Sequence, residues 1–484
     1  MFNNITIELI KTFSDEDVKN FGEYINCPLF NKRKELIKLY SVIIKCRPDY
    51  TNPVLKRERL FKKLYPQSRY DEQTLRSRMA ELSSLIRGFL TYAYLQKNSF
   101  RQKMIQAKEL MDRQKYILSE KILKDALEVL EKNKFSDPEY LENKYNVLTE
   151  LCSVLSAEEN YKERLKAEIS RAECYVNLFL KDILISAKDI ITLNIHNKDS
   201  MHSDYVNEFL KNLSIENFLM YLKNSENGFF NITAIYYYTY LTRKENYNEE
   251  HYFKLKEIIF REYSKFSKKD LFKFWDFLSG AVYPTLFNKD KKFYNERFEV
   301  DRFFAELDAF LTINEKYMYS QTFTNVFAGA AIVNELEWAE DFIIQNKEKL
   351  LPETRENTFN YCMALLHSKK KEYDKSLGYL GKIKFEELSY NLDVRMSYMM
   401  NYYELNLFEQ LYSSIDAYKH FISDNNNIPE HRFDWAKNSL KFMTKIAKAK
   451  SENKKISYAD LKEAESVDSF MNRKWILEKM KELV

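Results

Sequence analysis

Two histidines lie close together in the sequence, His196 and His202, and neighbouring imidazoles are a common way for a protein to hold zinc. Five residues separate them, and no cysteine or carboxylate pair stands beside them with metal-ligand spacing. The surrounding residues 194–203 are polar and break the helical periodicity, which is typical of a turn. We therefore predict a surface loop here and no metal site.

Motifs of several large enzyme classes are absent from the sequence. It has no glycine-rich phosphate loop, no His-Glu-x-x-His pair and no Gly-x-Ser-x-Gly nucleophile turn. Most carboxylates alternate with lysines at helical spacing, which is typical of a solvated helix face. The sequence therefore predicts no catalytic residue, no cofactor and a protein that is not an enzyme. An active site assembled from residues far apart in the sequence is the third-ranked alternative.

Cysteine thiols are the other residues that could do chemistry, as metal ligands, as nucleophiles or in disulfides. The five cysteines are odd in number, widely scattered and lack a close pair of metal-ligand spacing: Cys27, Cys46, Cys152, Cys174 and Cys362. This usage fits a reducing compartment, so we expect a cytoplasmic protein.

Two aromatic clusters could stack on nucleic-acid bases or grip a peptide. They are Tyr236-Tyr237-Tyr238-x-Tyr240 and Phe272-x-Phe274-Trp275-x-Phe277. Because consecutive residues point all around a helix, some of these rings must face inward. We expect core packing for most of them, with one or two tyrosines of the first cluster exposed.

The composition indicates which elements carry these residues. The chain has only seven glycines and eight prolines among 484 residues, whereas glycine makes up about 7% of average chains. Tight β-hairpins and phosphate-cradling loops both need glycine. With 45% hydrophobic and 31% charged residues, the chain can bury a large apolar core. We predict a soluble, nearly all-α protein.

The charge balance argues against a global electrostatic role. The 76 basic and 72 acidic residues are intermixed, which leaves a net charge of +4 and no overall field to hold a phosphate backbone or an anionic membrane. Residues 1–13 lack the continuous apolar core of a signal peptide. The most apolar later window, 176–193, contains four charged residues, so we expect no membrane insertion.

Local signals predict several helices. Ser14 with Asp17 has the form of a capping box, and Asp71 with Thr74 should open another helix. That second helix carries one apolar stripe, made of Leu75, Met79, Leu82, Ile86 and Phe89. Pro138 stands where a helix would begin, since its missing N–H is not needed in the first turn.

A helical repeat is marked by residues with one spacing. Trp338, Tyr373 and Phe408 fall 35 residues apart, and Gly329, Ala364 and Met399 stand nine places before them. Near the other end of the chain, Ala107, Tyr116, Ser119 and Leu123 reproduce the spacing of Ala364, Tyr373, Ser376 and Leu380. The spacing predicts a helix with a small residue, a turn, an aromatic at the start of the next helix, and a second small residue.

This pattern resembles the tetratricopeptide repeat, most clearly over 315–425 and also over 100–133. Asp341 and Leu411 depart from it where a small residue of the second helix is expected. The resemblance implies a right-handed α-solenoid of antiparallel helix pairs; a looser helical-repeat solenoid of the same geometry is the alternative. We predict an irregular helical region (1–95), a repeat region (96–313), the clearest repeats (314–425) and C-terminal capping helices (426–484).

The resemblance also implies a concave groove lined by the first helix of each pair. Its residues in this chain would be Phe323, Val326, Ala330, Tyr361, Leu365, Lys369, Met396, Met400 and Tyr403. An apolar row with methionines suits a protein or peptide partner with hydrophobic anchors, so we predict a non-catalytic interaction scaffold. The alternative for the row itself is contact with another helix of the same protein.

A second function is predicted as the alternative for residues 55–90, which resemble the two-helix core of the winged-helix domains of bacterial transcription activators. In that interpretation Arg76, Arg78 and Arg87 lie on the polar face of a recognition helix, and the lysines beside Phe61 meet phosphates. The strands and the hairpin wing of such a domain cannot be found in the sequence. Nucleic acid is therefore not the expected partner.

Overall fold

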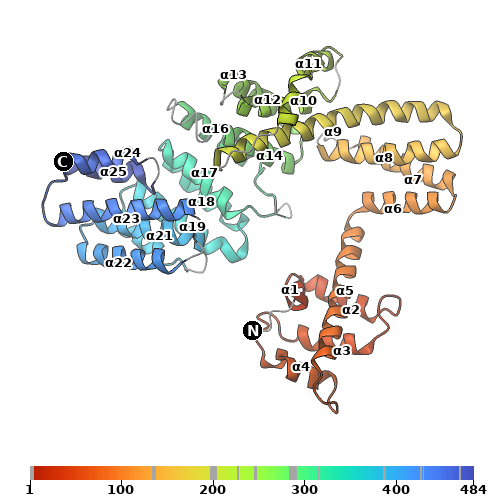
Figure 1. Cartoon of the computed structure of the whole chain (residues 1–484), viewed down its shortest axis with the longest axis horizontal. Helices are drawn as coiled ribbons and strands as arrows, with labels where there is room; N and C mark the ends of the chain where they lie inside the picture. The colour runs from red at the N-terminus through yellow and green to blue at the C-terminus, as the bar shows by residue number, and fades with distance from the viewer. Residues whose placement is uncertain are drawn as a thin grey trace. The chain divides into compact units, whose positions relative to one another are not determined.

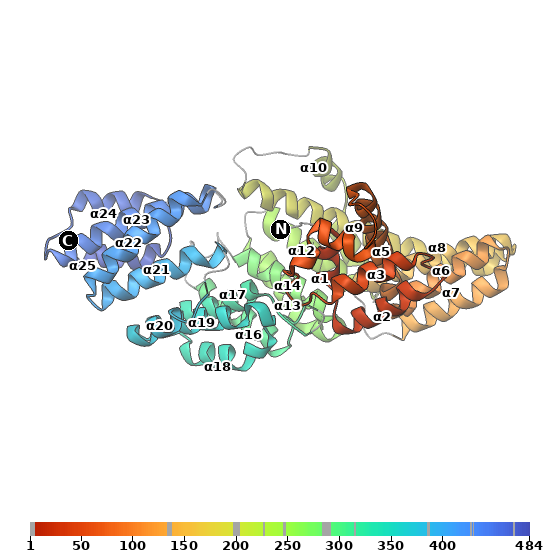
Figure 2. The same cartoon turned by 90° about the horizontal axis from the view of Figure 1, so that it is seen from below.

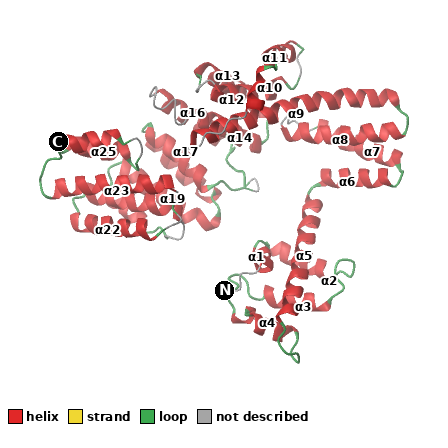
Figure 3. Ribbon diagram, viewed as in Figure 1, coloured by secondary structure: helices red, strands yellow, loops and turns green. Residues whose placement is uncertain are grey.

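The structure is a computed structural model, and it describes residues 5–132, 138–196, 204–225, 228–244, 248–282, 292–313, 316–384, 388–425, 428, 430–467 and 470–484. These residues form α-helices and short 3-10 helices with no β-strand (Figure 3), which confirms the all-α class. The chain divides into two compact units, Met1–Asn133 with Glu142–Tyr175 (unit 1) and Lys134–Leu141 with Val176–Val484 (unit 2). The boundary between the units passes through a long helix, between Tyr175 and Val176. The four regions defined from the sequence pattern stay a prediction.

Unit 1 holds the first helices of the chain (Figure 1). They are α1 (Ile5–Lys11), α2 (Asp15–Asn26), α3 (Lys34–Ile44), the 3-10 helix η1 (Pro53–Leu55), α4 (Arg57–Leu64), α5 (Glu72–Lys97), α6 (Ser99–Asp112), α7 (Tyr116–Glu131) and most of α8 (Pro138–Ala157). The first part of α9 (Tyr161–His196) also belongs to unit 1. The beginning of α8 at Pro138 is as predicted.

Unit 2 holds the remaining helices. They are α10 (Asp204–Lys211), α11 (Ile215–Asn224), α12 (Phe230–Lys244), α13 (Glu249–Glu262), η2 (Tyr263–Lys265), α14 (Lys268–Val282), α16 (Lys292–Glu306), α17 (Ser320–Ile332), α18 (Leu336–Asn346), η3 (Lys347–Lys349), α19 (Pro352–Lys369), α20 (Tyr373–Leu380), α21 (Leu388–Glu404), α22 (Phe408–Asp424), α23 (Glu430–Ser451), α24 (Tyr458–Ser466) and α25 (Arg473–Glu482). None of the helices, as far as their residues are described, combines the length and the apolar composition needed to cross a membrane.

The N-terminal core of unit 1 forms around α5, with α1 to α4 packed against it (Figure 1). The Ser14 hydroxyl accepts the N–H of Asp17, whose carboxylate accepts the N–H of Ser14, so the predicted capping box is confirmed. Asp71 caps α5 by accepting from the N–H of Gln73. The predicted stripe of α5 is also confirmed, because all five of its apolar residues are buried in this core.

Five helix pairs are joined by the same kind of turn. In each turn one residue has a positive φ, and the next helix begins two residues later; these residues are Gln114, Glu159, Asn334, Lys371 and Asn406. The N–H that follows this residue donates to a carbonyl oxygen five residues back, for example from Glu372 to His367 at 2.8 Å. This is the Schellman arrangement that ends many helices. The pairs α6/α7, α8/α9, α17/α18, α19/α20 and α21/α22 are therefore helical hairpins of one kind.

The predicted pairing of small residues is confirmed in two hairpins. The Ser119 hydroxyl donates to the carbonyl oxygen of Ala107 at 2.7 Å, and the Ser376 hydroxyl donates to that of Ala364 at 2.7 Å. All four residues are buried. The small side chains let the two helices of each pair approach closely enough for this bond.

The predicted position of Trp338 needs a correction. Tyr373 and Phe408 are the first residues of α20 and α22, whereas α18 begins at Leu336 and Trp338 is its third residue. Trp338 instead stacks on Phe342 along its own helix, with ring centroids 5.3 Å apart. The equal spacing of the three aromatics therefore does not mark equivalent positions.

The turns give the correct register for α18. Asn334 and Lys371 lie 37 residues apart, whereas Lys371 and Asn406 lie 35 apart. Counted from the turn, Ala339 is the equivalent of Ser376, and its side chain is completely buried. The small residue that the pattern requires is present, two positions before Asp341.

Gly329 is small for a reason other than contact with the second helix of its pair. A Cβ at this position would lie 2.6 Å from Oδ2 of Asp301 in α16. Asp301 is completely buried and accepts hydrogen bonds from Nε1 of Trp275 at 2.7 Å and from Nε of Arg297 at 2.8 Å. Gly329 thus leaves room for a buried carboxylate that two other helices, α14 and α16, hold in place.

The C-terminal helices form one core with the last hairpin. Helices α21 to α25 lie side by side (Figures 1 and 2), and their buried apolar residues form a single cluster. Ile476 and Met480 of α25 are buried in it. Trp475 donates from Nε1 to the Glu404 carboxylate of α21 at 2.9 Å.

Candidate functional site

The predicted groove row splits into buried and accessible residues. Five of its nine residues are buried: Phe323, Val326, Ala330, Met396 and Tyr403. Tyr361, Leu365 and Met400 are partly buried, and Lys369 is exposed. A partner could reach these four side chains, but the buried five take part in the packing of the chain itself.

The neighbours of the row explain this burial. Phe323 of α17 contacts Phe342 of α18, with ring centroids 5.1 Å apart. Tyr403 of α21 meets the edge of Trp475 from α25, and the Lys450 ammonium of α23 donates to its carbonyl oxygen. Over α21, helices of the same protein therefore occupy the face that was predicted to be open.

Most rings of the two aromatic clusters are core, as expected. The buried members are Tyr236, Tyr237, Tyr240, Phe274, Trp275 and Phe277. Tyr236 packs edge-on against Phe277, so the clusters lie against each other in unit 2. Only Tyr238 and Phe272 are partly exposed.

The three arginines of the nucleic-acid alternative do not share one helix face. At about 100° per residue, Arg76 and Arg87 of α5 lie on the same side and Arg78 on the opposite one. Arg78 is held by Glu81 and by the hydroxyl of Tyr65. Three other exposed cations of this region, Arg59, Lys62 and Lys63, line a hollow of 650 Å³ beside η1 and carry no ion pair among the described residues.

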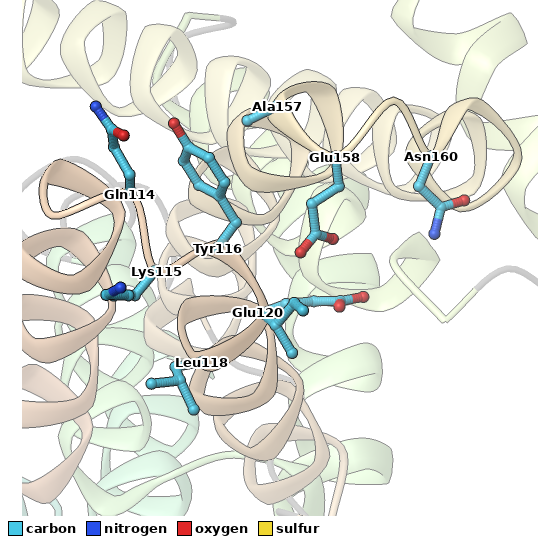
Figure 4. Close-up of a pocket in the computed structure, with 9 residues that line it drawn as sticks. Gln114, Lys115, Tyr116, Leu118, Glu120, Ala157, Glu158 and Asn160 are labelled. Carbon is cyan, nitrogen blue, oxygen red and sulfur yellow. The ribbon is translucent and has the colours of Figure 1, made fainter.

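A larger hollow, of 980 Å³, lies in unit 1 between two equivalent turns (Figure 4). One wall comes from the α6/α7 turn and the start of α7, and the other from the α8/α9 turn; the lining residues are Gln114, Lys115, Tyr116, Ile117, Leu118, Glu120, Ala157, Glu158 and Asn160. Figure 4 shows the Glu158 side chain extending from the end of α8 towards Glu120 on α7. The hollow thus combines two carboxylates with an aromatic ring and aliphatic side chains.

The two carboxylates of this hollow differ in their hydrogen-bond and ion-pair partners. The Lys124 ammonium lies 2.7 Å from one oxygen of Glu120. Oε1 of Glu158 is covered from solvent but has no hydrogen-bond partner among the residues described. Desolvation and the adjacent Glu120 carboxylate raise the pKa of Glu158, and Lys124 opposes the increase. Oε1 of Glu158 therefore lacks a hydrogen-bond donor that would stabilise the charged form of this carboxylate.

Exposed apolar side chains continue from the rim of the hollow along α9. Tyr161, Leu165 and Ile169 follow one another at four-residue spacing and are 69%, 63% and 54% exposed. Ile117, on the rim itself, is 77% exposed. Sequence reasoning missed this surface, because apolar residues at helical spacing normally mark a buried face. We call Tyr161, Leu165 and Ile169 the α9 stripe.

The described residues contain no group of three or more His, Cys, Asp or Glu side chains that could hold a metal ion. His196 is the last residue of α9, and His202 lies outside the described residues. All five cysteines are free, and burial raises the pKa of Cys174 to about 11. Such a thiol is a poor nucleophile at neutral pH.

In comparisons with known proteins, no family model, no curated protein and no solved structure matches the chain.

Proposed function

We propose that the protein is a non-catalytic interaction scaffold, a tetratricopeptide-like helical-repeat solenoid that binds a protein partner. One observation carries the proposal: the α9 stripe and the rim residue Ile117 expose large apolar side chains beside a hollow lined by two carboxylates. Large apolar side chains exposed together on one helix face are typical of protein–protein contact sites. The partner segment is amphipathic, with apolar anchors for the stripe and a basic residue for the carboxylates.

The repeated hairpin geometry supports the solenoid part of the proposal. Five hairpins share one turn, and two of them, far apart in the sequence, share the same serine-to-carbonyl hydrogen bond. Stacked helix pairs have extended surfaces on which partners bind. The hollow lies between corresponding turns of two successive hairpins, where such a stack would present a recess to a partner.

The proposal moves the contact surface away from most of the predicted groove. Tyr361, Leu365, Lys369 and Met400 could still add contacts, since their side chains are not buried. The α9 stripe is the stronger choice because its three residues are exposed and lie on one helix face.

The test is capture of partners by the full-length tagged protein from its own cells, in parallel with a Leu165→Glu and Ile169→Glu double variant. A matched control replaces two apolar residues of similar exposure elsewhere in unit 1, Ile105→Glu with Val129→Glu. We expect a partner that is lost with the stripe variant, is retained with the control and binds the purified protein directly. Recovery of the same proteins by all three forms would contradict the proposal.

Binding to nucleic-acid phosphates is a second candidate, and one observation favours it. Residues 1–97 hold 18 basic and 11 acidic side chains, and Arg59, Lys62 and Lys63 meet at one hollow. Such contacts make affinity fall steeply with salt. Replacement of all three by alanine should abolish DNA binding at low salt. Absence of DNA affinity in the unmodified protein would eliminate this candidate.

A further inference from the structure

We propose that the hollow of unit 1 binds an arginine side chain of the partner, with Glu120 and Glu158 as the acceptors of its guanidinium group. This inference rests on the proposed function, because it names the chemistry of the partner at the same surface.

The unpartnered oxygen of Glu158 indicates that the site lacks a donor. Oε1 is covered from solvent and receives no hydrogen bond among the described residues, although Glu158 lines a hollow large enough for a ligand. A carboxylate oxygen without a donor is costly when it is shielded from water. A donor that enters through the hollow would remove this cost.

Two features favour a guanidinium group over an ammonium group or a metal ion. Glu120 comes from α7 and Glu158 from the α8/α9 turn, and Lys124 already occupies one oxygen of Glu120, so the ligand must reach separate acceptors. A planar guanidinium offers five donors, whereas an ammonium is a point charge. A metal ion would need more ligands than these two carboxylates, and the described residues supply no larger cluster.

The remaining wall suits the rest of an arginine side chain. Tyr116, Ile117 and Ala157 line the hollow with an aromatic ring and aliphatic groups, against which the methylene stem can pack. The other charged group on the rim is Lys115, which lies on the α6/α7 turn (Figure 4). The carboxylates therefore attract the charged group, while the apolar wall is complementary in shape to the methylene stem.

The test uses the full chain and synthetic peptides, with affinity measured by calorimetry at low salt. The first peptide is acetylated and amidated and carries a single arginine between leucines. Matched peptides carry lysine or citrulline instead, and citrulline keeps the shape of arginine without its charge. We expect the arginine peptide to bind at least about tenfold more tightly than either, the loss expected for charge-assisted hydrogen bonds.

Variants of the two carboxylates test whether the arginine peptide binds in this hollow. Glu158→Gln and Glu120→Gln should each weaken the arginine peptide about tenfold or more. Glu128→Gln is the control, since this exposed residue of α7 pairs with Lys132 away from the hollow. Because a bound cation displaces the proton that a raised pKa retains on Glu158, the affinity should also increase as the pH rises above the range in which this carboxyl loses its proton.

The arginine assignment would be overturned if the citrulline or the lysine peptide bound as tightly as the arginine peptide. It would also be overturned if only the Glu128 control lost affinity. The absence of any binding at about 1 mM peptide, far weaker than a useful recognition site, would overturn it as well. A partner whose capture depends on the α9 stripe would still support the proposed function after such a result. Failure of the inference and failure of the proposed function can therefore be told apart.

Discussion

The hydroxyl of Ser376 donates to the carbonyl oxygen of Ala364, twelve residues earlier, and so joins the two helices of the α19/α20 hairpin. The same hydroxyl accepts from the side-chain amide of Asn401 in α21 at 2.8 Å. One buried serine therefore links a hairpin to the helix that begins the next one. Its counterpart Ser119 makes the first bond, to Ala107, at the same separation in sequence.

Ser376→Ala should destabilise unit 2 by about 1–3 kcal/mol, because the buried amide of Asn401 loses its acceptor. All four tryptophans of the chain lie in unit 2, so the loss can be measured by denaturant titration followed by tryptophan fluorescence. Asn401→Ala in the Ser376→Ala background should cost little more. A full additional cost would show that Asn401 acts through other contacts.

The sequence was sufficient to predict the helices and the close pairs, because capping residues and small residues act locally. Ser14, Asp71, Ser119 and Ser376 each do what their position predicted. The register of the repeat was harder to predict. Trp338 packs against Phe342 of its own helix and Phe298 of α16, and it lies two residues beyond the position given by the turn. Equal spacing of aromatics cannot reveal such an insertion.

The candidate site could not be predicted from the sequence, for a different reason. Burial depends on what covers a face, and α25 covers part of the predicted row although it lies about 70 residues further along the chain. Conversely, Leu165 and Ile169 have the spacing of a buried stripe and are exposed. The carboxylates of Glu120 and Glu158 meet only because two hairpins bring their turns together.

Lys371→Gly should stabilise unit 2 by about 0.5–1 kcal/mol, since a side chain with positive φ is strained and glycine is not. Asn406→Gly is the matched comparison at the equivalent turn. Asparagine tolerates this conformation, so its gain should be smaller. The thermal midpoint followed by tryptophan fluorescence measures both changes, and equal gains would argue against strain at Lys371.

Gly329→Ala should destabilise unit 2 by about 1–3 kcal/mol, because its Cβ would force the buried Asp301 carboxylate away from its donors. Gly378→Ala is the control, because nothing lies within 4 Å of the added carbon and the position is helical. Alanine there should stabilise by up to about 1 kcal/mol. Chemical denaturation of both variants checks the contrast, which would vanish if Asp301 could shift freely.

The stability of unit 2 should depend on pH through Asp301. Complete burial raises the pKa of this carboxyl from 3.8 to about 6, although Arg297 and Trp275 lower it. The folded state therefore binds more protons between about pH 4 and pH 6, so this contribution to stability decreases as the pH rises through that window and is constant above it. The pKa difference corresponds to about 3 kcal/mol. Relative to Asp301→Asn, the wild-type free energy of unfolding should decrease by about 2 kcal/mol from pH 4 to pH 7, since part of the full difference falls below pH 4. Denaturant titrations followed by tryptophan fluorescence measure this change. Parallel pH profiles of the two proteins would show that Asp301 does not titrate in this window.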